Sequence, residues 1–246
     1  GKINNITVPT TSATKDAAKK AIAQATQTKD AAIDASNLTD EEKADLKKQV
    51  AGEVQKANAA IDAATKADDV TTAKNTGVGK INNITVPTTS ATKDAAINAI
   101  NTALADKKTA ITGTNLTAEE KSTLVGQAQK LADDAIANIN KATTNDAVKT
   151  AKNTGVGKIN NITVPTTSAT KDAAKKAIAQ ATQTKDAAID ASNLTDEEKA
   201  DLKKQVAGEV QKANAAIDAA TKADDVTTAK NTGVGKINNI TVPTTS

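Results

Sequence analysis

The stretch Leu38-Thr39-Asp40-Glu41-Glu42, with the residues that follow it, decides how this chain folds. Thr39 and Glu42 have capping-box spacing: the threonine accepts a hydrogen bond from the third helical N–H, and the glutamate reaches back to the threonine N–H. The apolar residues that follow recur every three or four positions, which places them on one face of a helix. They are Leu46, Val50, Val54, Ala57, Ile61 and Ala64. The stretch therefore predicts a capped amphipathic helix, and the middle of the chain keeps the box as Thr117 and Glu120.

A helix is expected before this one. Thr14 is its predicted N-cap, Asp16 lies in the first turn where it favours the helix dipole, and the helix should stop near Ser36-Asn37. Apolar residues again recur at helical spacing, at Ala18, Ile22, Ala25, Ala32 and Ile33.

A third helix should begin at about Thr65–Asp68, and Gly77 leaves two accounts of it open. Asn75-Thr76-Gly77 is a common helix ending, so Gly77 is one possible C-cap. The alternative is that Gly77 faces inward and lets a neighbouring helix approach closely. Val70, Gly77 and Ile84 are spaced seven apart, and this unbroken phase favours continuity.

The whole pattern repeats every 78 residues. The string GKINNITVPTTSATKDAA begins at Gly1, Gly79 and Gly157, its first part returns at Gly235, and residues 1–78 and 157–234 are identical. Each copy of this string contains one proline, which cannot continue a helix and so marks a boundary between modules. These prolines are Pro9, Pro87, Pro165 and Pro243. The predicted division is 1–13 (the end of a preceding repeat and a linker), three-helix modules 14–86, 92–164 and 170–242, and linker 243–246.

Three helices joined by short loops predict an antiparallel bundle in each module. Because the helix count is odd, the chain enters a bundle at one end and leaves at the other. The predicted fold class is therefore all-α, with tandem three-helix bundles joined head to tail into an elongated, monomeric rod. The linker Pro87–Ala91 should be semi-rigid.

Composition excludes most site chemistry. The chain has no His, Cys, Met or aromatic residue and no Arg, so general acid–base catalysis by His, Cys nucleophiles and His/Cys metal sites are absent. We expect no enzyme activity and no catalytic, cofactor-binding or metal-binding residues. The 32 lysines are interspersed with 29 acidic residues, which argues against a nucleic-acid partner. No apolar run is long enough to span a membrane.

The charged motifs have simple interpretations. Asp40-Glu41-Glu42 is interpreted as a first turn that favours the dipole, not as a cation site. Lys19-Lys20 and Lys47-Lys48 are interpreted as solvated faces, with contact to anionic wall polymer as the alternative. Ion pairs along the helices are expected at Asp16–Lys20, Asp45–Lys48, Glu53–Lys56 and Asp62–Lys66.

The module resembles a family of repeats of unassigned function in giant wall-anchored surface proteins of staphylococci, streptococci and lactobacilli. Similar repeats occur in staphylococcal surface protein C, the methicillin-resistance-related surface protein and Ebh. The resemblance covers essentially the whole chain and rests on three segments: Thr14-Lys15-Asp16-Ala17-Ala18, Asn37-Leu38-Thr39-Asp40-Glu41-Glu42-Lys43 and Lys80-Ile81-Asn82-Asn83-Ile84. It implies a Gram-positive, wall-anchored, extracellular stalk with adhesion, biofilm or aggregation roles for the whole protein, and it carries over no site residues.

Two functions follow as hypotheses. The first is a structural stalk or spacer that projects another domain of a bacterial adhesin away from the cell wall. The alternative is a helical binding module whose partner is a host matrix or serum protein, or a like module on another cell in a biofilm.

Overall fold

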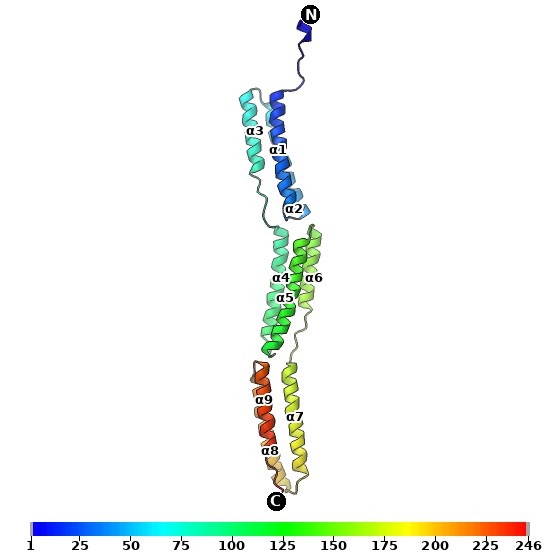
Figure 1. Cartoon of the computed structure of the whole chain (residues 1–246), viewed down its shortest axis with the longest axis vertical. Helices are drawn as coiled ribbons and strands as arrows, with labels where there is room; N and C mark the ends of the chain where they lie inside the picture. The colour runs from blue at the N-terminus through cyan, green and yellow to red at the C-terminus, as the bar shows by residue number, and fades with distance from the viewer. Residues whose placement is uncertain (1, 245–246) are drawn as a thin grey trace. The chain divides into compact units, whose positions relative to one another are not determined.

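The computed structural model describes residues 2–244, so the outermost positions of the predicted segments 1–13 and 243–246 lie outside the described residues. Within this range the chain has a short 3₁₀ helix, nine α-helices and no strand. This confirms the all-α fold class, with three helices to each repeat (Figure 1). The elements are η1 (Lys2–Asn5), α1 (Ala13–Ala35), α2 (Asp40–Ala63), α3 (Ala67–Asn82), α4 (Ala91–Thr112), α5 (Ala118–Lys141), α6 (Asn145–Asn160), α7 (Ala169–Asp190), α8 (Asp196–Ala219) and α9 (Ala223–Asn238).

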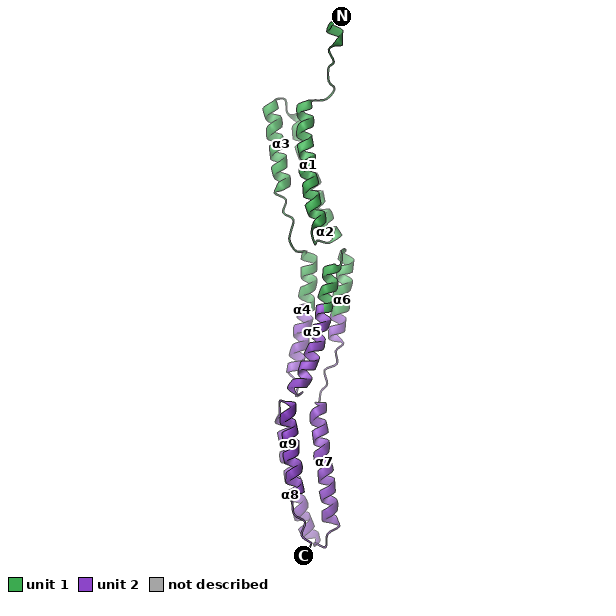
Figure 2. Cartoon of the chain, viewed as in Figure 1, with its two compact units in different colours: residues 1–100, 134–155 green, residues 101–133, 156–246 purple. Residues whose placement is uncertain are grey.

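The chain divides into two compact units (Figure 2). The first unit holds α1–α3 with the beginning of α4, the end of α5 and most of α6, as residues 1–100 and 134–155. The second holds the remainder of those three helices with α7–α9, as residues 101–133 and 156–246. Each unit is described below by itself.

In the first unit α1, α2 and α3 all pack on one another and enclose an aliphatic core. The stripe predicted for α2 is confirmed, because Val50, Ala57 and Ile61 are buried and the remaining members pack partly buried against them. The rest of the core comes from Ala18, Ile22, Ile33, Val70 and Ile81. In the second unit α7, α8 and α9 pack in the same way around the equivalent residues.

Helix α3 is continuous through Gly77, which settles the open alternative. Gly77 is buried, and a Cβ built on it would lie 2.5 Å from the Ala57 Cβ of α2 and 2.8 Å from the Ile22 Cδ1 of α1. A side chain at this position would collide with α2, so the glycine is what allows the two helices to pack so closely.

The structure corrects one predicted helix start through a local hydrogen bond. The N-cap of α1 is Ser12, not Thr14, and the Ser12 side chain accepts a hydrogen bond from the Lys15 N–H at 3.1 Å. Serine is a stronger cap than threonine, and Ser12 places Asp16 within the first turn. The end of α1 at Ala35, with Ser36 as C-cap, and the capping box of α2 are as predicted.

Lysine side chains donate hydrogen bonds to carbonyl groups at the C-terminal ends of helices. Lys29 Nζ of α1 donates to the Asn82 and Ile84 carbonyls at the end of α3, at 3.1 and 2.7 Å, and Lys43 Nζ of α2 donates to the Asp34 carbonyl at 3.0 Å. A cation at a helix C-terminus satisfies free carbonyls and favours the dipole. This accounts for part of the high lysine content without any ligand.

The middle repeat packs in the same manner within each unit. In the first unit, Gly155 of α6 faces Ala135 of α5 and Ile100 of α4. In the second unit, Lys107 of α4 donates to the Asn160 and Ile162 carbonyls at the end of α6.

Candidate functional site: the joints between repeats

Clusters of polar side chains link separate segments of the chain where one repeat meets the next. The first joint, within the first unit, brings the α1–α2 turn (residues 37–42) against residues 90–93 and the α5–α6 turn (residues 140–145). The second joint, within the second unit, brings residues 115–120 against residues 168–171 and 218–223.

Glu42 is the centre of the first joint. Its carboxylate accepts the Thr39 N–H at 2.8 Å, which completes the capping box of α2. The same carboxylate accepts the Ser90 hydroxyl at 2.6 Å and both the N–H and the hydroxyl of Thr92 at 3.1 Å. One side chain therefore caps its own helix and also holds the first turn of α4 in the next repeat.

The neighbouring residues of the acidic triplet extend this exchange to α6. The Asn145 N–H, the first of α6, donates to the Glu41 carboxylate at 3.1 and 3.2 Å. In return, the Asp40 N–H, the first of α2, donates to the Thr143 carbonyl at 2.7 Å. The first N–H groups of a helix have no partner inside it, so each repeat supplies acceptors that the other repeat's helices lack.

A buried lysine of α4 also takes part in the first joint. Lys93 of α4 is only 4% exposed, and its Nζ donates to the Asn140 carbonyl at 2.9 Å and to the Asn37 side-chain oxygen at 3.5 Å. Burying an ammonium group is costly unless it is hydrogen-bonded. The two oxygen acceptors, from Asn140 and Asn37, make the buried position tolerable.

The second joint repeats these contacts with the equivalent residues. Glu120 accepts the Ser168 hydroxyl at 2.6 Å and the Thr170 N–H at 3.1 Å, and Lys171, 3% exposed, donates to Asn115 at 3.3 Å. The Ala223 N–H donates to Glu119 at 2.9 Å, and the Ala118 N–H donates to the Thr221 carbonyl at 2.8 Å. Two occurrences of one hydrogen-bond set indicate a built interface.

Modules 14–86 and 170–242 have identical sequences, so they form a natural control for the effect of a neighbour. Thr39 is fully buried, whereas its equivalent Thr195 is exposed. Glu198 keeps the capping-box contact with the Thr195 N–H at 2.8 Å but is itself exposed. Since the sequences are the same, the burial of Thr39 and Glu42 comes from the joint.

The joint also changes the acidity of the carboxylates. Burial raises the pKa of Glu42, but hydrogen bonds from Ser90, Thr39 and Thr92 outweigh it and lower the pKa to about 2. The same balance lowers the pKa of Glu120 to about 2. For Glu198 the hydrogen bonds from Thr195 alone lower the pKa. Glu42 and Glu120 are therefore ionised at any pH above about 3.

Sequence reasoning found Thr39 and Glu42 as a cap but missed the joint. Asp40-Glu41-Glu42 does open its own helix as expected, and it also caps two helices of the next repeat. One signal was present: the Ser-Ala-Thr-Lys string at residues 90–93 recurs at 168–171, and a Glu-Glu pair precedes each string at a constant offset, at residues 41–42 and 119–120. Local patterns do not reveal contacts between residues about 50 or 104 positions apart.

The expected ion pairs form only in part. Glu53 and Lys56 pair along α2 at 3.6 Å as predicted. The prediction for Asp62 is wrong, because Asp62 pairs with Lys19 of α1 at 2.6 Å and not with Lys66. Lys47 similarly pairs with Asp34 of α1 at 2.6 Å. Lys19 and Lys47 are therefore ion-paired between helices, which weakens the alternative that they contact wall polymer.

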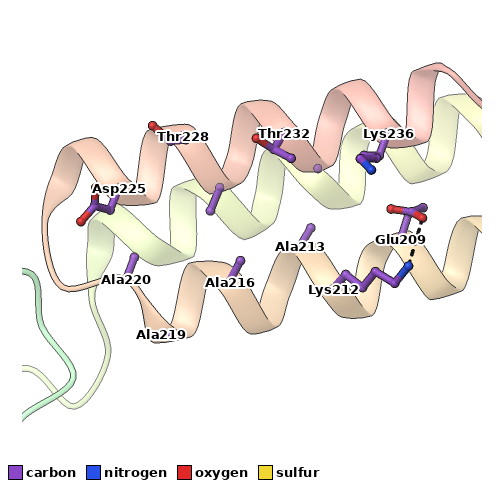
Figure 3. Close-up of a pocket in the computed structure, with 12 residues that line it drawn as sticks. Glu209, Lys212, Ala213, Ala216, Ala219, Ala220, Asp225, Thr228, Thr232 and Lys236 are labelled. Carbon is purple, nitrogen blue, oxygen red and sulfur yellow. Dashed lines mark ion pairs between the residues drawn. The ribbon is translucent and has the colours of Figure 1, made fainter.

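A shallow groove runs between α8 and α9 (Figure 3). Ala213 and Ala216 line it from α8, Ala220 lines it directly after the end of that helix, and Thr228 and Thr232 line it from α9. Glu209 and Lys212 pair with each other at 3.5 Å at its edge. The equivalent groove lies between α2 and α3. The groove between α8 and α9 is lined by five alanines, two threonines, one glycine and four charged residues.

No three acidic side chains among residues 2–244 gather into a group that would hold a metal ion. No helix in the same range is both long and apolar enough to cross a bilayer.

The fold and the joints define a class of protein: an all-helical tandem-repeat chain whose repeats are linked in series by reciprocal helix capping. A family model matches residues 14–89, 92–167 and 170–245, and the chain belongs to this family, the Domain of Unknown Function (DUF1542). The matches are three tandem copies of a domain known from Gram-positive surface proteins. Comparison with curated proteins and with solved structures finds no match.

Proposed function

We propose that this chain is a structural repeat region, a stalk or spacer, that projects another domain of a bacterial surface protein away from the cell wall. The observation that carries the proposal is the joint. A chain of independent beads needs no contacts between repeats, whereas here Glu42 and Glu120 each hold the first turn of the following repeat. Joints that restrict bending suit a spacer, because a flexible chain of the same length reaches less far.

The composition supports the same role. The identical modules 14–86 and 170–242 add length without adding chemistry, and the side chains that carry nucleophilic or acid–base catalysis by Cys or His are missing from the sequence. Lysine and glutamate are used at helix ends, and lysine and aspartate form the ion pairs between helices. We propose no enzymatic step, and we propose an extracellular, wall-anchored location for the full-length protein.

Small-angle scattering of the dilute chain tests the spacer. Bundles whose two longer helices have 22–24 residues, joined in series, give roughly 110–130 Å and hence a radius of gyration of about 35 Å, whereas a compact chain of this length has about 18 Å. The double variant Glu42→Ala/Glu120→Ala should lower the measured radius by loosening the joints. Glu198→Ala removes the same cap without a following module and should leave it unchanged. A radius of about 18–22 Å for the unaltered chain would refute the spacer.

Location is tested separately on intact cells that carry the full-length protein. An antibody against this region should label the cells without permeabilisation, and enzymatic digestion of the wall should release the labelled protein. Labelling that requires permeabilised cells would contradict the surface location.

The recurring groove favours a second candidate, a binding module for a helical segment of a host matrix or serum protein. An amphipathic helix laid on Ala213, Ala216 and Ala220 would bury its apolar face there. The test is saturable binding of micromolar affinity or tighter to a purified matrix or serum protein. Ala216→Lys should abolish that binding, and Lys176→Ala, on α7, should not.

A further inference from the structure

The hydrogen bonds of each joint connect two consecutive modules, so they exist only while both modules are folded. Glu42 of module 14–86 accepts hydrogen bonds from Ser90, which directly precedes α4, and from Thr92 of α4. Glu41 accepts the first N–H of α6. Unfolding of either module therefore removes hydrogen-bond partners from the other.

The dependence runs in both directions across a joint. The Asp40 N–H, the first of α2, donates to the carbonyl of Thr143, two residues before α6, at 2.7 Å. Lys93 of α4 donates to the Asn37 side chain of the α1–α2 turn at 3.5 Å. The first N–H groups of a helix have no partner inside it. Each module thus loses a helix cap when its neighbour unfolds.

The linker between two modules leaves the joint little slack. Val86 packs against the core of module 14–86, and Ser90 is only 2% exposed within the first joint. Residues 87–89 alone separate these two positions. A connection this short gives the two sides of the joint a high effective concentration, so the joint forms whenever both modules are folded.

The modules differ in the amount of aliphatic side chain that they can bury. Leu104 of α4 is 7% exposed, at the position where the first repeat has Thr26. In the opposite sense, Ala128 replaces Val50, but module 92–164 still has fifteen Val, Ile and Leu residues where each neighbour has twelve. Burial of aliphatic area is the main stabilising contribution to such a core, so the middle module has the largest stability of its own.

We propose that the joints couple the unfolding of neighbouring modules, so that module 92–164 keeps modules 14–86 and 170–242 folded. In a chain of repeats, stability is the sum of each repeat's own stability and of the interfaces with its neighbours. Here the interface is the joint, whose carboxylates accept charge-assisted hydrogen bonds, each worth about tenfold or more in an equilibrium constant. This goes beyond the spacer function, because coupling does not depend on how far the chain reaches.

Hydrogen exchange of the full chain, measured by mass spectrometry, tests the coupling. The variant Ile100→Asp/Ile139→Asp places two charges at fully buried positions and unfolds module 92–164. The exchange rate is measured on peptides of α3 and α9, which share one sequence and lie in the two other modules. Exchange in these helices should become about tenfold faster or more, because the open state of each outer module no longer costs a joint.

A joint variant shows whether the carboxylates carry this effect. Its substitutions are Glu41→Ala, Glu42→Ala, Glu119→Ala and Glu120→Ala. In this background the two aspartates should change the exchange rate of α3 and α9 by less than about threefold, since uncoupled sites have additive effects. The matched control is Glu197→Ala/Glu198→Ala, which removes the equivalent exposed pair of α8 and its capping-box contact. This control should retain the tenfold acceleration.

Two results would overturn the proposal. If the two aspartates do not speed the exchange of α3 and α9 in the otherwise unaltered chain, the modules unfold independently. If they speed it equally in the joint variant, the coupling does not pass through the joint carboxylates. Scattering measures the reach of the chain and exchange measures the coupling, so the spacer function and this proposal can fail separately.

Discussion

Alanine at the buried glycines of the third helices should destabilise the bundles, whereas alanine two residues further along the same helices should stabilise them. A Cβ on Gly77 would lie 2.5 Å from the Ala57 Cβ, far inside the normal carbon–carbon contact of about 3.5–4.0 Å. Helices α2 and α3 would have to separate by about 1 Å, and such overpacking costs about 1–3 kcal/mol. A Cβ on Gly79 meets nothing within 4 Å.

Both substitutions gain the same helix propensity, about 0.5–1 kcal/mol for replacing glycine. The expected net effect is therefore a loss of about 0–2.5 kcal/mol per module at Gly77 and a gain of about 0.5–1 kcal/mol at Gly79. Making the same substitution in all three repeats shifts the unfolding transition of the whole chain. The two variants are Gly77→Ala/Gly155→Ala/Gly233→Ala and Gly79→Ala/Gly157→Ala/Gly235→Ala.

Thermal unfolding of the full chain, followed by circular dichroism at 222 nm, separates the two outcomes because the chain has no aromatic residue for fluorescence. A difference of 1 kcal/mol in the free energy of unfolding shifts the midpoint by about 4–8 °C in a domain the size of one module. The buried-site variant should melt below the unaltered chain and the exposed-site variant above it. If both variants shift the midpoint in the same direction by similar amounts, the close approach at Gly77 is not a real constraint.

The joints should resist acid: the pKa of Glu42 is about 2, below its unfolded value of 4.5, so its stabilising effect is present above pH 4.5 and is lost as the pH falls towards 2. Titration followed by NMR should give Glu42 a lower pKa than Glu198, and equal values would contradict the joint. Ile61→Asp should unfold its own module, since an unpaired buried charge costs about 3–5 kcal/mol, while Lys47→Ala should change the melting temperature little. Hydrogen exchange should be slowest in module 92–164, which has fifteen Val, Ile and Leu residues where each neighbour has twelve, and faster exchange there would refute this.

The helices themselves could be predicted because their signals are local. The capping box at Thr39 and Glu42 and the apolar stripe of α2 lie within one helix, and the structure has them as expected. Gly77 shows where local reading becomes ambiguous. The string Asn75-Thr76-Gly77 is typical of a helix end, and only the packing of Ala57 and Ile22 against the glycine explains why the helix continues.

The partners of charged side chains could not be predicted in the same way. Asp62 has Lys66 at helical spacing, yet it pairs with Lys19 because α1 and α2 lie against each other. The joint was missed for the same reason, since Glu42 meets Ser90 only after two bundles have formed. Spacing along one helix says which residues share a face but not which other helix that face meets.

Identical sequences in different surroundings show most clearly what the local sequence decides and what the tertiary structure decides. Residues 2–8 and 80–86 are the same string, yet Ile81 is fully buried at the end of α3 while Ile3 is 85% exposed in η1. The sequence by itself determined the repeat, the helices with their caps and the apolar faces, because propensity, capping and periodicity act within a few residues. Only the tertiary structure decided that α3 runs through Gly77, that Lys80–Asn82 completes that helix and that Glu42 accepts hydrogen bonds from the next repeat. The physical reason is that burial and hydrogen bonds to distant residues supply the free energy for these features, and a short segment lacks both until its neighbours are in place.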